Sequence, residues 1–397
     1  MRILIVTAGS RGDVAPFTGL GRRLLEAGHS VALAAHDRFA DLVLSAGLEH
    51  RTLPGDPVEL VRARTAAPSP SEAQAVFAEF LHKLGDGIVA AVAAGTDLVL
   101  TAFGPAPLSR AVANSAGLPS AGVYLAPGVP ANDSGWPVTR DVVDRSAALY
   151  APVLRRLSLA EPRAAGWPVF HGFSPAVVPR PPDWPDNVHI TGYWWPYRSE
   201  AWQPPDQLAD FLQSGPPPVF IGFGSMTPSQ EQLQDIVSAA VTRAGVRAVV
   251  QAGWAELGPA GDDILVVGDL PHEWLFPRTA AVVHHAGAGT AAAGLRAGVP
   301  AVPVPVLVDQ PFWAGRLVDL GVAPRSLPMT ELTADALAQA LRACLDQPSY
   351  RDRATELARR IGAEDGAELV LAAAARLEAA PTPASAQPRR SAPPPPT

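Results

Sequence analysis

The 397-residue chain contains a single lysine, Lys83, and a single cysteine, Cys344. A P-loop requires lysine followed by serine or threonine, and Leu84 follows Lys83, which argues against P-loop nucleotide hydrolysis. One cysteine cannot form an intrachain disulfide, so a reducing compartment is favoured. The net charge of −7 has the opposite sign to the basic surface of a nucleic-acid-binding protein.

Other features that the sequence lacks argue against further classes of protein. No apolar run reaches the ~18 residues that suggest a membrane helix, and the first residues show no signal-peptide pattern. No two aspartates are spaced as Asp-x-Asp, and the nine histidines show no zinc-ligand spacing. We therefore expect a cytoplasmic protein with no stable membrane insertion, no nucleic-acid partner, no metal site and no cofactor.

Apolar runs and helical patterns alternate along the chain. Residues 3–6 form a continuous apolar run typical of a buried parallel strand, Gly9 and Gly12 follow it, and Pro16 suits the first turn of a helix. A similar unit begins at residues 219–222. Further strands are predicted at residues 31–35, 98–100, 121–124, 247–250, 264–267, 281–284 and 301–306. This alternation predicts an α/β fold with two Rossmann-like, doubly wound parallel sheets.

The pattern divides the chain into four parts. We predict an N-terminal domain at 1–195, a proline-rich linker at 196–217, a C-terminal domain at 218–379 and a disordered tail at 380–397. Ligands of such sheets bind beyond the carboxyl ends of the strands, so two facing domains would share one cleft.

The most informative segment is His284-His285-Ala286-Gly287-Ala288-Gly289-Thr290, between a predicted strand and an alanine-rich helix. Its glycines allow a close approach of the backbone, and free N–H groups at a helix start favour an anion such as a diphosphate. The alternative is a tight turn in which the two histidines cap neighbouring backbone. Gly287, Gly289 and Ala292 also satisfy a dinucleotide fingerprint, which keeps an NAD(P)-dependent oxidoreductase as an alternative.

Two carboxylates follow predicted strands. Asp309 and Gln310 offer an acceptor and an amide that together suit adjacent sugar hydroxyls, although Asp309 alone could simply cap a helix. Asp13 lies at the first strand–helix junction, where it could accept a proton from a substrate hydroxyl or only stabilise the helix dipole.

Four segments together resemble the inverting GT-B glycosyltransferases of family 1, in the branch of bacterial antibiotic and sterol glucosyltransferases. The resemblance runs in order from about Met1 to about Leu377. The segments read TAGSRGDVAPFTGLGRRLLEAGH, GFGSM, LPHEWLFPRTAAVVHHAGAGTAAAGLRAGVP and PVLVDQPFWAGRL. One departure is Ala286, which replaces the first glycine of the usual His-His-Gly-Gly motif.

The resemblance implies residue roles. Asp13 matches the general base of the SRGDV branch, and Asp309 and Gln310 match the pair that holds the donor sugar. The donor nucleotide and diphosphate would be bound by Ser10, Arg11, Ser225, Leu270, His285, Gly287, Gly289 and Thr290. The last helix of the C-terminal domain is expected to pack back on the N-terminal domain.

The function implied is transfer of a hexose or deoxyhexose from a UDP- or dTDP-sugar to a hydroxyl of a small, largely apolar natural product, with inversion. Phe77, Phe80 and Trp136 are candidates for the acceptor pocket, although ordinary core packing also explains the two phenylalanines. A monomer or weak dimer is expected. Besides the oxidoreductase, the alternatives are a non-hydrolysing sugar-nucleotide epimerase and an inactive binding partner.

Overall fold

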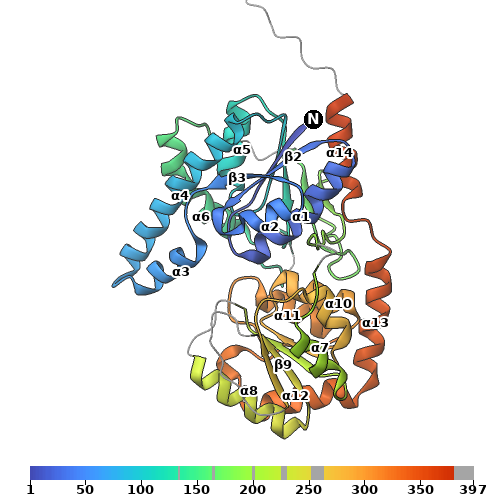
Figure 1. The fold of residues 1–397 in the computed structure, drawn as a ribbon. Helices are drawn as coiled ribbons and strands as arrows, with labels where there is room; N and C mark the ends of the chain where they lie inside the picture. The colour runs from blue at the N-terminus through green and yellow to red at the C-terminus, as the bar shows by residue number, and fades with distance from the viewer. Residues whose placement is uncertain (133–134, 163–165, 199–201, 225–229, 252–262, 380–397) are drawn as a thin grey trace, which may run out of the picture.

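A computed structural model describes residues 1–132, 135–162, 166–198, 202–224, 230–251 and 263–379. Two α/β domains lie one above the other, each with a parallel sheet between layers of helices (Figure 1). Among the described residues no helix is both long and apolar enough to cross a membrane. The tail predicted to be disordered, 380–397, lies outside the described residues.

The N-terminal sheet has the order β3-β2-β1-β4-β5-β6-β7, and every neighbouring pair is parallel. Its strands are β1 (Arg2–Val6), β2 (Ser30–His36), β3 (Glu49–Leu53), β4 (Leu98–Thr101), β5 (Ser120–Tyr124), β6 (Val169–His171) and β7 (Val188–Ile190). The helices before the second domain are α1 (Arg11–Glu26), α2 (Ala40–Ser45), α3 (Pro57–Ala66), α4 (Pro70–Ala93), α5 (Ala106–Ser115), α6 (Arg140–Arg156) and α7 (Asp206–Gln213).

The C-terminal sheet has the order β10-β9-β8-β11-β12 and is also parallel throughout. Its strands are β8 (Val219–Gly222), β9 (Ala248–Gln251), β10 (Ile264–Val267), β11 (Val282–His284) and β12 (Ala301–Pro303). The helices are α8 (Gln230–Ala244), α9 (His272–Leu275), α10 (Ala288–Ala297), α11 (Gln310–Asp319), α12 (Ala334–Asp346), α13 (Pro348–Gly362) and α14 (Glu368–Ala379). The predicted doubly wound α/β fold is confirmed.

Three strands were not predicted from sequence, for physical reasons. β3 reads Glu-His-Arg-Thr-Leu and is mostly accessible, because as an edge strand it needs no apolar run. β6 and β7 have three residues each, too few for a periodic pattern.

Two local expectations are wrong. α1 begins at Arg11 rather than near Pro16, so this proline is buried inside the helix. The stretch predicted to be an unpacked linker contains α7, whose Leu208 is 1% exposed in the core of the C-terminal domain. Prolines stand before and after α7, where they delimit a short helix instead of excluding one.

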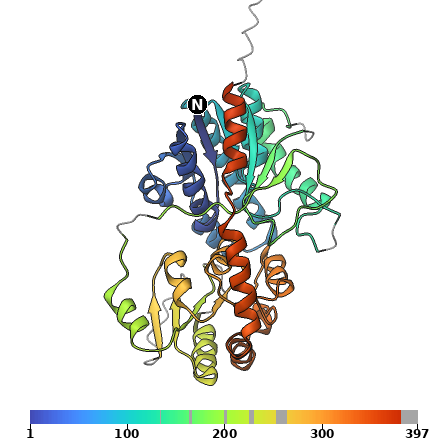
Figure 2. The same ribbon diagram turned by 90° about the vertical axis from the view of Figure 1, so that its right-hand side faces the viewer.

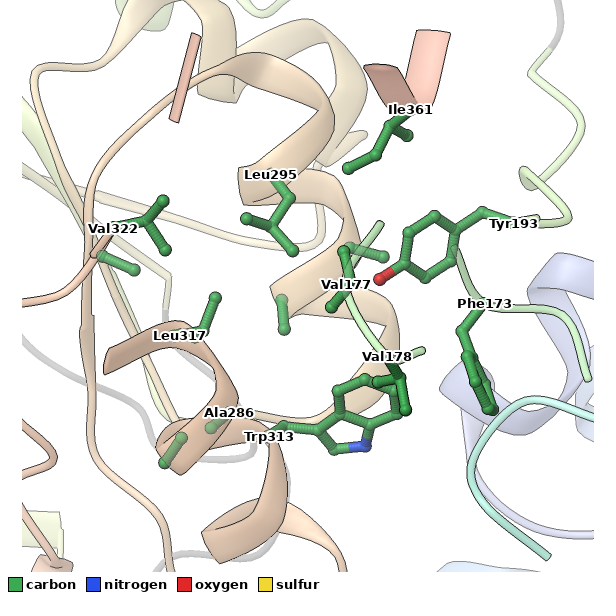
Figure 3. Close-up of a cluster of buried hydrophobic side chains, with 14 of the residues drawn as sticks. Phe173, Val177, Val178, Tyr193, Ala286, Leu295, Trp313, Leu317, Val322 and Ile361 are labelled. Carbon is green, nitrogen blue, oxygen red and sulfur yellow. The ribbon is translucent and has the colours of Figure 1, made fainter. Parts of the chain in front are cut away.

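An apolar core is shared between the two domains. Phe173, Val177 and Val178, which follow β6, pack with Trp313 and Leu317 of α11 in one buried cluster (Figure 3). Arg316 of α11 also donates hydrogen bonds of 3.1 and 2.8 Å to the Val177 carbonyl. Packing between the segment after β6 and helix α11 therefore holds the two domains together.

The C-terminal helices provide a second connection. α13 and α14 run in succession past both domains (Figure 2). Val370 and Ala374 of α14 are buried in the same cluster as Ile3 of β1. At the crossing, the Trp194 indole donates a 2.7 Å hydrogen bond to the Gly366 carbonyl, and Arg23 pairs with Asp365 at 2.7 Å.

This crossing leads to a prediction about stability. Trp194→Phe would leave the buried Gly366 carbonyl without its donor, at a cost of about 1–3 kcal/mol. The expected results are a lower melting temperature and faster hydrogen exchange in α14. Arg23→Gln is the control, because its ion pair is half-exposed and contributes less than about 1 kcal/mol. A larger effect for Arg23→Gln than for Trp194→Phe would contradict this account.

Candidate active site

The two sheets have equivalent topological switch points. In the N-terminal sheet, β1 lies between β2 and β4, and in the C-terminal sheet, β8 lies between β9 and β11. Chain connections leave in opposite directions on either side of these strands, which opens a crevice at their carboxyl ends. The loop after β1 leads into α1, and the loop after β11 leads into α10. α1 and α10 contact each other, so the carboxyl ends of the two sheets lie on facing sides of the two domains.

Asp13 is held in the first turn of α1. The Ser10 N–H and hydroxyl both donate to Asp13 Oδ2, at 2.7 and 2.9 Å. The buried Thr7 hydroxyl donates to the Asp13 carbonyl at 2.7 Å. Gly9 has φ +142°, and a Cβ there would overlap the Asp13 carboxyl group. The loop therefore fixes one carboxylate oxygen, while Oδ1 takes no part in the hydrogen bonds found among the described residues.

The charges of two carboxylates, one from each domain, influence each other. The pKa of Asp13 is raised above its usual value, mainly by loss of solvation, and the negative charge of Asp309 in the other domain raises it slightly further. Hydrogen bonds from Ser10 oppose this shift. The Asp13 side chain still has access to solvent. Loss of solvation also raises the pKa of Asp309, against a hydrogen bond from Trp313. Asp13 is thus a stronger base than an ordinary aspartate.

His285 follows β11 and lies between two glycines. A Cβ at Gly224 would come within 2.9 Å of its Cε1, and a Cβ at Gly287 within 2.5 Å of its Nε2. Burial lowers the pKa of His285, so the ring is neutral at neutral pH. Its neighbour His284 is fully buried, with a pKa of about 3, and its Nδ1 accepts from the Ala286 N–H at 3.0 Å. Only His285 therefore has solvent access from this pair.

The start of α10 is suited to an anion. Gly287 is the N-cap residue and makes no side-chain capping bond, and Gly289 is exposed with open space around its α-carbon. Thr290 is partly exposed in the same first turn. N–H groups at a helix start, left without a capping side chain, attract negative charge. Ala286, which precedes this turn, has φ +60°, the conformation that the usual glycine adopts without strain.

Asp309 is the N-cap residue of α11, but its side chain does not cap the helix. Instead, Oδ2 accepts a 2.8 Å hydrogen bond from the Trp313 indole. Oε1 of the buried Gln310 accepts from the Val306 and Leu307 N–H groups at 2.8 and 3.1 Å. The Gln310 oxygen is therefore occupied by its own loop, and the simple capping interpretation of Asp309 is wrong.

Sequence reasoning missed a polar group at the ends of β9 and β10. Gln251 Nε2 donates to Asp269 Oδ1 at 3.0 Å, and Gln251 Oε1 lies 3.3 Å from His272 Nε2. The pKa of His272 is lowered to about 4, chiefly by burial and then by the charge of Arg11. Arg11 thus acts electrostatically on the opposite domain. Gln251 is the last residue of β9, and Asp269 and His272 follow β10; polar residues at the carboxyl ends of strands are the signal that could have identified them.

The remaining sequence-based candidates are dispersed. Leu270 is partly buried in front of α9, and Ser225 lies outside the described residues. Phe77 and Phe80 stack 6.3 Å apart on α4, against the N-terminal core. Trp136 is 7% exposed and packs edge-on against Phe312 of the other domain. The structure thus places Trp136 in a different cluster from the two phenylalanines, and the acceptor pocket stays a prediction.

An aromatic residue not singled out from sequence follows the strand that pairs with β1. Phe103 follows β4, across the switch point from β1, and is 41% exposed. A Cβ on its neighbour Gly104 would lie 3.9 Å from the Ala8 carbonyl of the Asp13 loop. In the opposite domain, Leu307 and Val308 are 40% and 81% exposed just before Asp309. Exposed apolar side chains therefore follow β4 and directly precede Asp309.

Two facing Rossmann-like domains define the GT-B class of glycosyltransferases, and comparisons with known proteins agree. Residues 3–106 match the model of the glycosyltransferase family 28 N-terminal domain, and residues 238–374 match the erythromycin biosynthesis protein CIII-like C-terminal domain. Solved structures with this fold include the kitacinnamycin glycosyltransferase (TM-score 0.72, 21% identity, 95% of this chain and 98% of that chain). Another is VinC in complex with dTDP (TM-score 0.71, 22% identity, 95% and 100%).

Curated relatives are closer in sequence. The chain is 36% identical over 420 residues to O-mycaminosyltylonolide 6-deoxyallosyltransferase of Streptomyces fradiae, covering 93% of this chain and 95% of that one. It is 33% identical over 412 residues to a sterol 3-beta-glucosyltransferase of Arabidopsis thaliana, covering 92% of this chain and 66% of the plant enzyme. The chain belongs to the family 1 GT-B glycosyltransferases, and the expected resemblance is confirmed.

The environment of Asp13 predicts the pH dependence of turnover. On the expectation that Asp13 is the general base, kcat/KM should fall as the pH drops through its raised pKa, above the ordinary value of about 3.9, because a base must be ionised. Ser10→Ala removes a hydrogen bond that favours the ionised form, so the acidic limb should move to higher pH. Asp309→Asn removes a like charge and should move the limb to lower pH. Profiles of kcat/KM against pH test this, and limbs that stay in place in both variants would contradict it.

Proposed function

We propose that the chain transfers a hexose or deoxyhexose from a UDP- or dTDP-sugar to a hydroxyl of a small, largely apolar natural product, with inversion at the anomeric carbon. The observation that carries this proposal is the arrangement of the two sheets: Asp13 lies after the switch-point strand β1, and the uncapped start of α10 lies after β11, which pairs with the switch-point strand β8. The first can accept a proton, and the second can hold a diphosphate.

The reaction follows from these two groups. The acceptor hydroxyl attacks the anomeric carbon from the face opposite the nucleotide, and its proton passes to Asp13. The bond to the diphosphate breaks, and the developing negative charge is stabilised by the α10 amide groups, Thr290 and a neutral His285. Asp309 accepts hydrogen bonds from the sugar. Because attack and departure occur on opposite faces, the product has the inverted configuration.

We further propose that turnover needs no resident metal. The donors that would bind the diphosphate are already gathered at the start of α10, and Arg11 approaches from the other domain. Among the described residues, no group of three or more His, Cys, Asp or Glu side chains could hold a metal ion. Activity that survives chelation with EDTA would support this point, and loss restored by Mg²⁺ would refute it.

The donor and acceptor classes rest on relatives. One curated relative is by name a deoxyallosyltransferase acting on O-mycaminosyltylonolide, others are sterol glucosyltransferases, and VinC was crystallised with dTDP. The exposed apolar side chains of Phe103, Leu307 and Val308 suit an apolar acceptor.

Replacing the base separates chemistry from binding. Asp13→Asn keeps an acceptor for the Ser10 N–H but cannot take up a proton, so kcat should fall about 100-fold or more. The affinity for dTDP-glucose or UDP-glucose, measured by calorimetry, should stay within roughly threefold, because the removed function acts only during turnover. His285→Ala is the contrasting variant and should weaken nucleotide-sugar binding.

Two outcomes would contradict this proposal. Unchanged kcat in Asp13→Asn would remove Asp13 as the base. Interconversion of a sugar nucleotide by the wild-type protein without any acceptor would instead favour an epimerase. Release of nucleoside diphosphate only in the presence of an acceptor is the expected behaviour.

Acceptor recognition can be tested at Phe103. Phe103→Ala should raise the acceptor KM roughly three- to eightfold, since covering the 41% of this side chain that is exposed contributes about 0.6–1.2 kcal/mol, while the donor KM stays constant. Phe77→Ala tests the sequence-based expectation in parallel. A raised acceptor KM in Phe77→Ala but not in Phe103→Ala would place the pocket beside α4.

A further inference from the structure

The orientation of the Asp309 carboxylate depends on one side chain. The Trp313 indole N–H, one helical turn further along α11, donates to Asp309 Oδ2 at 2.8 Å. Asp309 forms no capping bond with the helix amides, and the indole N–H is the side-chain donor found on its carboxylate among the described residues. No side chain of the described residues is found donating to Oδ1.

Trp313 is in turn fixed by the other domain. It is 2% exposed, and its ring lies 5.8 Å from that of Phe173 at 75° and 5.2 Å from that of Phe312 at 72°. Figure 3 shows the indole among Phe173, Val177 and Val178, all from the N-terminal domain. The direction of the N–H bond is therefore set by packing between the domains.

The loop before Asp309 is fixed as well. Val308 has φ +61°, a strained conformation for a β-branched residue, and its side chain is 81% exposed, so burial does not hold it there. The bonds from the Val306 and Leu307 N–H groups to Gln310 Oε1 hold the preceding backbone. Backbone and carboxylate are thus constrained separately, an arrangement typical of a pre-organised binding group.

We propose that Trp313 is a positioning residue for the donor sugar: its indole N–H orients Asp309, so that Oδ1 accepts hydrogen bonds from the sugar hydroxyls. The inference rests on the proposed function and assigns a role to a residue that would not touch the donor. The opposing explanation is that a buried indole simply needs an acceptor for its N–H. The two explanations differ in what the loss of this N–H does to sugar binding.

The test is Trp313→Phe, which keeps an aromatic ring and removes the N–H. Calorimetry is done with four probes: UDP, dTDP, UDP-glucose and dTDP-glucose. The affinity for UDP and dTDP should stay within roughly twofold of wild type. The sugar-dependent gain, which is the ratio of the affinity for a sugar nucleotide to the affinity for the matching nucleoside diphosphate, should fall about 10-fold, because the Asp309 carboxylate is no longer held. In kinetics, the donor KM should rise while the acceptor KM stays constant.

Two comparisons exclude a merely structural role. Trp184→Phe removes another buried indole N–H, which donates to the Pro130 carbonyl at 3.1 Å in the same apolar cluster, and should leave the sugar-dependent gain unchanged. In an Asp309→Asn background, Trp313→Phe should add no further loss of sugar affinity, because Trp313 acts through this carboxylate. If Trp313→Phe does not fold, benzothienylalanine at position 313, which replaces the N–H with sulfur, provides the same comparison.

The inference is overturned if Trp313→Phe leaves the sugar-dependent gain unchanged. It is also overturned if the variant loses as much affinity for UDP and dTDP as for the two sugar nucleotides. A full additional loss in the Asp309→Asn background would also overturn it. Failure of the proposed function has a different signature: the wild-type protein itself would show neither turnover nor any affinity gained from the sugar. Wild-type turnover with an unaffected Trp313→Phe variant would overturn the inference alone.

Discussion

The site depends on an apolar interface that keeps the carboxyl ends of two parallel sheets opposite each other. Neither sheet alone brings a base and an anion-binding turn together. Phe173, Val177 and Val178 of the N-terminal domain share a buried core with α11, and α14 returns to the N-terminal domain from the other side. With both connections in place, Asp13 and Asp309 lie close enough for one charge to raise the pKa of the other.

The electrostatics of the cleft follow from the types of group gathered there. Apart from Arg11, the candidate donors for a diphosphate are neutral: the amide groups at the start of α10, the Thr290 hydroxyl and a His285 whose pKa burial has lowered. Fixed dipoles in a partly dehydrated site stabilise developing charge without first having to reorient. This arrangement fits a chain whose single lysine, Lys83, pairs with Glu79 on α4.

Backbone strain is concentrated in the loops that precede helices α10 and α11. Of the three non-glycine residues with positive φ found in the described part of the chain, Ala286 precedes the start of α10 and Val308 precedes Asp309. Each such conformation costs on the order of 1–3 kcal/mol and persists only where the surroundings impose it. The packing of Ala286 in the shared core and the bonds to Gln310 supply that constraint. Local sequence preference is thus violated beside the residues expected to contact the donor.

Much of this protein could be read from its sequence, because the relevant signals are local. Buried parallel strands are continuous apolar runs, and turns before helices are marked by glycine, so the two sheets and the segments at Asp13, His285 and Asp309 were predictable. Short and edge strands such as β6 and β3 lack that signal, and the prolines around α7 obscured a helix packed on the core.

Only the tertiary structure decided which groups meet. The hydrogen bond between Trp313 and Asp309 joins residues four apart, but the direction of the indole is set by Phe173, far away in the chain. The proximity of Gly104 to the Asp13 loop depends on the pairing of β1 with β4, and the separation of Trp136 from Phe77 depends on how the N-terminal domain folds. Sequence patterns report the periodicity of single elements, whereas these contacts depend on the distances between elements, which the packing of the whole chain determines.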